Sequence, residues 1–329
     1  MILRPYQQLA VSRGAKALKK KRNTLIVAPT GAGKTVMLSA LVGEVGPAKA
    51  LILQHRDELV EQNLSKFHTV NPSYMLSRYD AAQKSWRGRA VFAMVQTLCR
   101  PKNLDTIGKL DLVVVDEAHH SAAASYLKIL ETVKERNPNA MVAGFTATPM
   151  RSDNKGLRKV FDNCADKVTI KELIDLGFLV PPKAFVIDVG TQQALSQVKK
   201  LASDYDPGEV EAIMNKRPIN AEVVRNWKEK AGDRKTIVFC STIKHAQDVQ
   251  AAFVDAGVAA EMVDGSTPRQ QRAMLLRRFK AGDFQVLVNV GVLVEGFDEP
   301  TVSCVVLLRP CSFKSTMIQM IGRGLRIVN

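Results

Sequence analysis

A short glycine-containing segment directly after an apolar run is the feature that most constrains this chain. Residues 24–27 read Thr-Leu-Ile-Val, and residues 28–35 read Ala-Pro-Thr-Gly-Ala-Gly-Lys-Thr. A strand, such a loop and then a helix, here predicted over residues 34–43, form the arrangement that holds nucleotide phosphates at the positive end of the helix. The pattern predicts a buried strand whose carboxyl end carries a phosphate-binding loop.

The residue types in this loop each have a chemical role. Glycine lets the backbone turn tightly so that N–H groups point at phosphate oxygens. We expect Lys34 to reach the β and γ phosphates and the Thr35 hydroxyl to ligate Mg²⁺. Ala28 stands where the usual pattern has glycine, which is acceptable if its φ is negative. The alternative is a glycine-rich turn that binds nothing. The predicted nucleotide-binding residues of the loop are Thr30, Gly31, Ala32, Gly33, Lys34 and Thr35.

A second apolar run, residues 113–115, is followed by Asp116, Glu117, Ala118, His119 and His120. Carboxylates at the end of a buried strand suit a Mg²⁺·nucleotide site. Asp116 is expected to hold the metal, and Glu117 to orient and deprotonate the water that attacks the γ phosphate. The alternative is a strand that ends in acidic turn residues. Adjacent histidines point to different sides, so we expect one of them to couple the nucleotide site to a second domain.

Short apolar runs alternate with amphipathic stretches along most of the chain. They lack period-two alternation, which is typical of strands covered on both faces. The pattern predicts an α/β fold with mainly parallel sheets. Strands are expected at residues 24–28, 50–53, 90–95, 110–115, 141–145, 235–240, 259–263, 285–290 and 302–308. Helices are expected at residues 34–43, 56–67, 125–136, 170–176, 221–231, 244–256, 268–280 and 315–322.

The two series of strands predict two α/β domains. The first spans residues 1–150, and the second spans residues 235–329 and lacks a phosphate-binding loop. Residues 151–234 are more polar and contain proline and glycine breakers, so they are interpreted as a connector with small helices. Any nucleotide chemistry of the second domain must therefore act on a ligand held by the first.

Composition narrows the class of partner. The net charge of +15 suggests a polyanion, although a solvated basic surface is the alternative. Aromatic residues make up 6% of the chain, so extensive stacking on bases is not expected. The five cysteines form no C-x-x-C pair and are interpreted as buried free thiols of a reducing compartment. The sequence opens with no signal peptide and holds no bilayer-length apolar stretch, so a cytoplasmic location is expected.

The ordered set of motifs resembles a superfamily 2 helicase of the DEAH type, in the bacterial and phage branch related to nucleotide-excision-repair helicases. Residues 28–35 and 116–119 match motifs I and II of that family. The other matching segments are residues 3–7 (adenine-reading motif), 53–56 (Ia), 95–97 (Ib), 146–148 (III), 238–241 (IV), 295–298 (V) and 319–326 (VI).

The resemblance implies two tandem RecA-like domains with a nucleotide cleft between them, and ATP and Mg²⁺ as cofactors. It implies adenine contacts from the segment containing Arg4 and Gln7. Gly296, Asp298 and Gln319 would also bind the nucleotide, with Asp298 on the ribose. Nucleic acid would be contacted by Arg56, Thr97 and Ser241. Such contacts are mainly to phosphates and give little sequence preference.

Motif VI contains two arginines, Arg323 and Arg326, spaced three residues apart. We expect both on one helix face, from which they reach across a cleft to the γ phosphate as arginine fingers. The alternative is a basic helix face in solvent.

These observations predict an ATP-dependent helicase or translocase that moves on or unwinds nucleic acid, with DNA favoured over RNA, no membrane partner and a monomeric state. The alternative is a nucleic-acid binding or annealing module whose ATPase is weak or lost. The sequence stops three residues after Arg326, where domains of this type continue with a strand and a helix. We therefore expect the second domain to be truncated.

Overall fold

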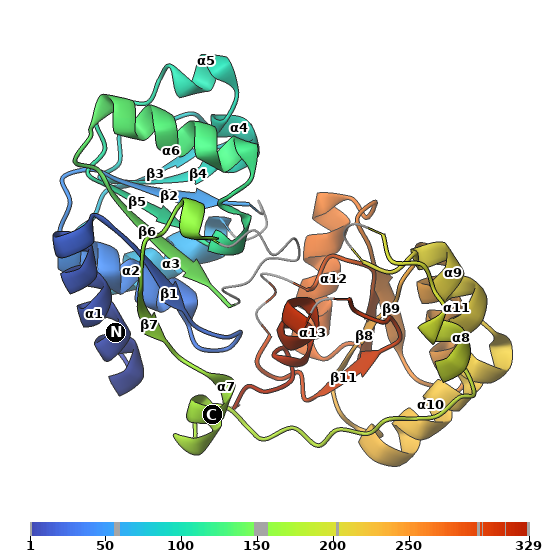
Figure 1. The fold of residues 1–329 in the computed structure, drawn as a ribbon. Helices are drawn as coiled ribbons and strands as arrows, with labels where there is room; N and C mark the ends of the chain where they lie inside the picture. The colour runs from blue at the N-terminus through green and yellow to red at the C-terminus, as the bar shows by residue number, and fades with distance from the viewer. Residues whose placement is uncertain are drawn as a thin grey trace. The chain divides into compact units, whose positions relative to one another are not determined.

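The structure, a computed structural model, describes residues 2–55, 60–147, 157–201, 204–294, 297, 299–312 and 314–327. The chain divides into two compact units, Met1–Leu173 and Ile174–Asn329. Each unit contains a parallel β-sheet with helices on both faces (Figure 1). The predicted α/β class with mainly parallel sheets is confirmed.

The sheet of the first unit has seven strands in the order β3-β4-β2-β5-β6-β1-β7, and all the pairings between them are parallel. The central strands are almost completely buried because helices cover them on both sides, which explains their continuous apolar runs. The strands are β1 (Asn23–Val27), β2 (Ala50–Gln54), β3 (Leu76–Tyr79), β4 (Ala90–Met94), β5 (Leu112–Val115), β6 (Met141–Thr146) and β7 (Cys164–Lys167).

Helices of the first unit lie on both faces of this sheet. Figure 1 shows α1, α2 and α3 on one face and α6 on the other, and α1 packs on α2 and α2 on α3. Tyr126, Ile129 and Val133 of α6 enter a core formed with β-strand residues. The helices are α1 (Pro5–Lys21), α2 (Lys34–Val45), α3 (Val60–Val70), α4 (Val95–Leu98), α5 (Pro101–Leu104), α6 (Ala124–Arg136) and α7 (Ile170–Asp175), with short 3₁₀ turns η2 (Ala118–His120) and η3 (Leu157–Lys159).

The register of the sheet brings three strand ends to one edge. β6 lies between β1 and β5, with Thr146 beside Val27 and Gly144 beside Val115. The segments that follow β1, β5 and β6 therefore start within two strand spacings of one another. This is the edge at which ligands bind in open parallel sheets.

The second unit has a four-stranded parallel sheet in the order β11-β8-β10-β9. Successive residues of a strand face opposite sides, so Val238 packs under α10 and α11 while Ile237 and Phe239 pack under α12 and α13. The strands are β8 (Thr236–Phe239), β9 (Ala260–Val263), β10 (Val286–Asn289) and β11 (Cys304–Leu307). The helices are α8 (Gln192–Ser196), α9 (Pro207–Met214), α10 (Arg217–Ala231), α11 (Ile243–Asp255), α12 (Arg269–Ala281) and α13 (Lys314–Ile321).

A small segment ahead of α10 has a hydrophobic cluster of its own. Val198, Val210, Met214 and Ile219 are buried together, with contributions from α8 and α9. Lys200 and Tyr205 form an antiparallel bridge just before α9. This part of the predicted connector is thus a folded element of the second unit. The sequence did not indicate a function for it.

All nine predicted strands are present, and β3 and β7 were missed. β3 contains Ser77 and Arg78, and β7 is a partly exposed edge strand with Asp166 and Lys167, so neither has the continuous apolar run of a central strand. The interpretation of the cysteines as buried is wrong in part: all five are free, but Cys164 is exposed and Cys99, Cys304 and Cys311 are half-buried. Within the described ranges, every helix is too short or too polar to span a bilayer.

Candidate nucleotide site

The loop after β1 has the backbone that its glycines predict. Gly31 and Gly33 adopt φ values of 86° and 76°, which side chains other than glycine disfavour. A Cβ on Gly33 would also lie 2.6 Å from Nε2 of Gln7. Ala28 is not among the described non-glycine residues with positive φ, so the alanine fits there as expected. α2 begins directly after Gly33, which leaves its N-terminal N–H groups at the loop.

Two side chains of α1 hold this loop from behind. The Tyr6 hydroxyl donates to the Ala32 carbonyl at 2.9 Å, and Gln7 Nε2 donates to the same oxygen at 3.0 Å. Gln7 Oε1 also accepts from the backbone N–H of Arg4 at 3.0 Å, which fixes the amide plane. α1 thus determines the shape of the phosphate loop, a role that the sequence did not indicate. The adenine contacts of Arg4 and Gln7 stay predictions.

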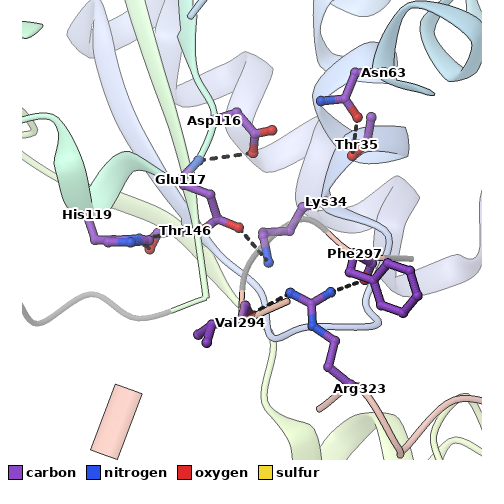
Figure 2. A network of polar contacts seen from close by, with 10 residues as sticks. All are labelled: Lys34, Thr35, Asn63, Asp116, Glu117, His119, Thr146, Val294, Phe297 and Arg323. Carbon is purple, nitrogen blue, oxygen red and sulfur yellow. Dashed lines mark hydrogen bonds and ion pairs between the residues drawn. The ribbon is translucent and has the colours of Figure 1, made fainter. Parts of the chain in front are cut away.

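A chain of polar contacts links the loop to the acidic segment after β5 (Figure 2). Lys34 Nζ lies 3.9 Å from Glu117 Oε1, and His119 Nδ1 lies 3.5 Å from Glu117 Oε2. His119 Nδ1 also lies 3.2 Å from the hydroxyl of Thr146, at the end of β6. Residues that the sequence assigned to three separate motifs therefore meet around one carboxylate.

Glu117 has an unusual backbone. Its φ of 49° and ψ of 55° lie in the left-handed region, and Arg22 is the one other described non-glycine residue with positive φ. Such conformations cost free energy and concentrate at functional sites. The turn aims the Glu117 side chain at Lys34, whereas a continuation of β5 would send it to a face of the sheet.

Asp116 is the most perturbed carboxyl in the site. It is 9% exposed, and its Oδ1 accepts the backbone N–H of Glu117 at 3.0 Å. Burial, and next the negative charge of Glu117, raise the pKa of Asp116 to about 7, although Lys34 acts in the opposite direction. A buried carboxyl next to another carboxylate has an uncompensated negative charge when it is ionised. A divalent cation would compensate that charge.

Thr35 is held by a residue that sequence reasoning missed. Its hydroxyl donates to Oδ1 of Asn63 at 3.4 Å, and Asn63 is 4% exposed on α3. Ser39 bonds the Thr35 carbonyl at 2.7 Å one helical turn later. Asn63 is a polar residue on the buried face of a helix. This pattern could have pointed to it, but polar residues occur at such positions in many cores without any role in a site.

The segments expected to touch nucleic acid approach the same edge. Gln96 donates to the His55 carbonyl at 2.9 Å, and the ring of His55 stacks on that of His120 with centroids 4.8 Å apart. Residues 53–55 therefore contact the acidic segment directly, and Gln96 reaches it through His55. Thr97 is 8% exposed, and Arg56 lies outside the described residues.

In the second unit, the helix predicted to carry both motif VI arginines ends too early. α13 stops at Ile321, so the expectation that Arg323 and Arg326 share a helix face is wrong. Gly322 and Gly324 follow the helix, and Arg326 instead forms an antiparallel bridge with Leu179. Glycine disfavours continuation of the helix. Arg326, which is paired in the bridge, has an extended backbone and lies outside the helix.

Arg323 is buried, with 6% of its surface exposed. Its guanidinium donates to the carbonyls of Val294, at 2.7 Å, and Phe297 (Figure 2). Burial lowers the pKa of Arg326 to about 10, which still leaves it cationic at neutral pH. Gln319 is 5% exposed on α13 and Ser241, after β8, is half-buried, whereas Gly296 and Asp298 lie outside the described residues.

Comparisons with known proteins match both units. Residues 1–151 match the family model described as type III restriction enzyme, res subunit, and residues 216–328 match the helicase conserved C-terminal domain. The protein named "Putative ATP-dependent helicase IRC3" of Saccharomyces cerevisiae is 32% identical over 99% of this chain and 50% of its own length. This chain thus spans about half of that relative.

Two further proteins extend the comparison. The "DNA 3'-5' translocase XPB2" of Sulfurisphaera tokodaii is 24% identical over 98% of this chain and 78% of its own length. A solved fragment titled as a "putative HsdR subunit of a type I restriction enzyme" from Vibrio vulnificus is 23% identical, covers 100% of this chain and 62% of its own, and superposes with a TM-score of 0.71. Both domain models match the chain in order, and the phosphate loop and the acidic segment lie together, so the chain resembles the superfamily 2 helicases over both of its units.

Proposed function

We propose that this chain is the ATP-hydrolysing motor of a helicase or translocase that acts on DNA. One observation carries the proposal: Lys34, Glu117 and Asp116 meet at one sheet edge beside a loop whose glycines have positive φ. A glycine-rich turn that binds nothing gives no reason for a buried carboxyl with a raised pKa and a strained Glu117 in the same place.

ATP and Mg²⁺ fit the residues present. The loop N–H groups and Lys34 would hold the phosphates, while the Thr35 hydroxyl and the Asp116 carboxylate would hold the metal. Asp116 supports this because its carboxyl is buried. Among its described neighbours, only Lys34 and His119 contribute positive charge. Bound Mg²⁺ would neutralise charge on the phosphates and favour the ionised form of Asp116.

The other residues of the site hold and move the proton of the attacking water. Glu117 accepts that proton as general base, and Lys34 and His119 fix its two oxygens in place. Thr146 fixes His119 in turn, so that a shift at the end of β6 changes the orientation of the base. We propose that Arg323 and Arg326 stabilise the transferring phosphoryl group when the two units close on the nucleotide.

DNA is the proposed partner because one relative is named a DNA translocase and the chain carries a net charge of +15. Contacts to phosphates would give little sequence preference. The proposal includes a monomeric state and a cytoplasmic location in a bacterial or phage-infected cell, with Arg56, Thr97 and Ser241 on the strand, Arg4 and Gln7 on adenine, and Gly296, Asp298 and Gln319 on the nucleotide.

An ATPase assay with five additions tests the proposal: no polymer, single-stranded DNA, duplex DNA, branched DNA and RNA. We expect hydrolysis to rise at least about tenfold with one of the DNA forms. Glu117→Gln serves as the control for contaminating ATPase. Polymer binding without hydrolysis above that control would favour the binding or annealing module, and stimulation by RNA alone would change the proposed partner.

A further inference from the structure

The small folded segment ahead of α10 makes a polar clamp on the loop that leads into motif VI. Asp204 is the centre of this clamp. Its Oδ1 accepts the backbone N–H and the hydroxyl of Ser312, both at 2.8 Å, and its Oδ2 forms an ion pair with Arg309. Arg309 and Ser312 lie between β11 and α13, more than one hundred residues away in the chain.

The ion pair at the centre of the clamp is partly buried, and its carboxylate has several hydrogen-bond donors. The Asp204 and Arg309 side chains are 18% and 21% exposed. Burial alone would raise the pKa of Asp204, but hydrogen bonds from Ser312, then Tyr205, and the charge of Arg309 hold it below its ordinary value. Four charge-assisted contacts on one carboxylate exceed what a surface ion pair provides.

The same segment also holds the neighbouring loop of the sheet. Glu211 on α9 accepts the hydroxyl of Thr242, the residue that caps α11 directly after Ser241. β8 and β11 are adjacent and parallel, so the loops after them lie at the same edge. Asp204 and Glu211 therefore hold two neighbouring loops, one that precedes α13 and one that precedes α11.

We propose that Asp204 is a positioning residue for motif VI, which fixes the start of α13 and through it the arginines that follow. Ser312 lies two residues before α13, so the bonds from its N–H and hydroxyl to Asp204 would hold the chain close to the start of the helix. Asp204 touches neither nucleotide nor metal in this scheme. The inference rests on the proposed function, because it assigns Arg323 and Arg326 to the hydrolysis step.

Asp204→Asn is the test variant, since it keeps the shape and removes the charge and one acceptor oxygen. Asp206→Asn is a matched control: Asp206 lies two residues away, and its side chain accepts the N–H groups of Gly208 and Glu209 at the start of α9, a cap that asparagine also provides. We expect Asp204→Asn to lower kcat for DNA-stimulated ATP hydrolysis about tenfold with KM for ATP changed less than about twofold. The control variant should retain both constants.

Two further measurements separate the clamp from a general loss of structure. Hydrogen exchange of the nucleotide-free protein should be faster in residues 314–321 of Asp204→Asn and unchanged in α12. Adding Ser312→Ala to Asp204→Asn should lower kcat no further, because both changes remove the same contact. Unchanged exchange at α13, an equal effect in α12, or a rise in KM with kcat unchanged would overturn the inference. If the wild-type chain hydrolyses no ATP, the proposed function fails, while faster exchange confined to α13 still supports the clamp.

Discussion

In the proposed site, the side chains around Glu117 are the ones expected to decide whether a bound nucleotide is hydrolysed. Its left-handed backbone places the carboxylate between Lys34 and His119, at 3.9 and 3.5 Å. Lys34 therefore has two roles in the proposed site, as a partner of the phosphates and as a partner of the base. Glu117 has one role there, that of the base. The two residues should fail differently when they are changed.

Lys34→Ala should abolish hydrolysis and weaken ATP binding by at least about tenfold, because the cation on the β and γ phosphates is lost. Glu117→Gln should bind ATP normally and lower kcat by about a hundredfold or more. Binding of a fluorescent ATP analogue and steady-state turnover, measured on the same preparations, check both. Turnover near the wild-type rate in Glu117→Gln would show that another group positions the water.

Gly33 is restricted by two independent conditions. Its φ of 76° disfavours any side chain, and a Cβ would lie 2.6 Å from Gln7 Nε2. We expect Gly33→Ala to lose nucleotide binding and to destabilise the first unit by about 1–2 kcal/mol. Adding Gln7→Ala removes the contact but not the backbone strain, so it should restore only part of the stability. Full recovery in the double variant, measured by urea denaturation, would contradict the strain argument.

At the scale of elements, α11 carries the least expected buried group of the second unit. His245 is fully buried in its first turn, and within the described residues neither ring nitrogen has a hydrogen-bond partner. Burial lowers the pKa of His245, although the carboxylates of Glu211 on α9 and Asp248 on α11 oppose the shift. The folded state therefore favours neutral histidine, and α11 is most stable when that ring carries no proton.

A histidine with a lowered pKa in the folded state loses stability as pH falls from its unfolded value of about 6.5 toward the folded value. The second unit should lose about 1.4 kcal/mol per pH unit across that window. His245→Gln should flatten the dependence. Fluorescence of Trp227, which packs on Phe253 of α11, reports unfolding once Trp86→Phe has removed the tryptophan of the first unit. An equal pH slope in the His245→Gln variant would exclude this cause.

At the scale of the whole molecule, the proposed reaction needs both units. Arg323→Ala should lower kcat by orders of magnitude with ATP affinity nearly unchanged, because its contact with the phosphoryl group is proposed only for the reacting state. Steady-state turnover and equilibrium ATP binding check this. Full DNA-stimulated activity from residues 1–173, the first compact unit, would refute a role for motif VI.

The proposed binding to DNA also involves the molecule as a whole, because it depends on the net positive charge of the chain. With phosphate contacts dominant, affinity should fall at least about tenfold between 50 and 200 mM salt and vary little with base sequence. Fluorescence anisotropy with two unrelated oligonucleotides of equal length measures both effects. Affinity that is constant in salt, or confined to one sequence, would instead indicate a base-reading module.

Local chemistry allowed the sequence alone to determine the central strands of the first sheet, the four strands of the second, the phosphate loop and the acidic segment. These features depend on residues that are close together in the sequence: an apolar run, a pair of glycines or two adjacent carboxylates. Their local structure can therefore be predicted without knowing the rest of the fold. The edge strand β7 lacked such a local signal. The helical spacing assumed for Arg323 and Arg326 failed because Gly322 and a bridge to Leu179, far away in the chain, end the helix first.

Only the tertiary structure decided which distant groups became partners. Gln7 holds Ala32, Asn63 holds Thr35, and Asp204 holds Ser312 from 108 residues away. Each of these contacts depends on strand order, on register and on which helix covers which face. Strand order, register and helix placement depend on the packing of the whole core. Each apolar face is buried against elements that are far apart in the sequence, so no local pattern determines its partner. For this reason the residues proposed for the reaction could be predicted from the sequence, whereas the residues that hold them in place could not.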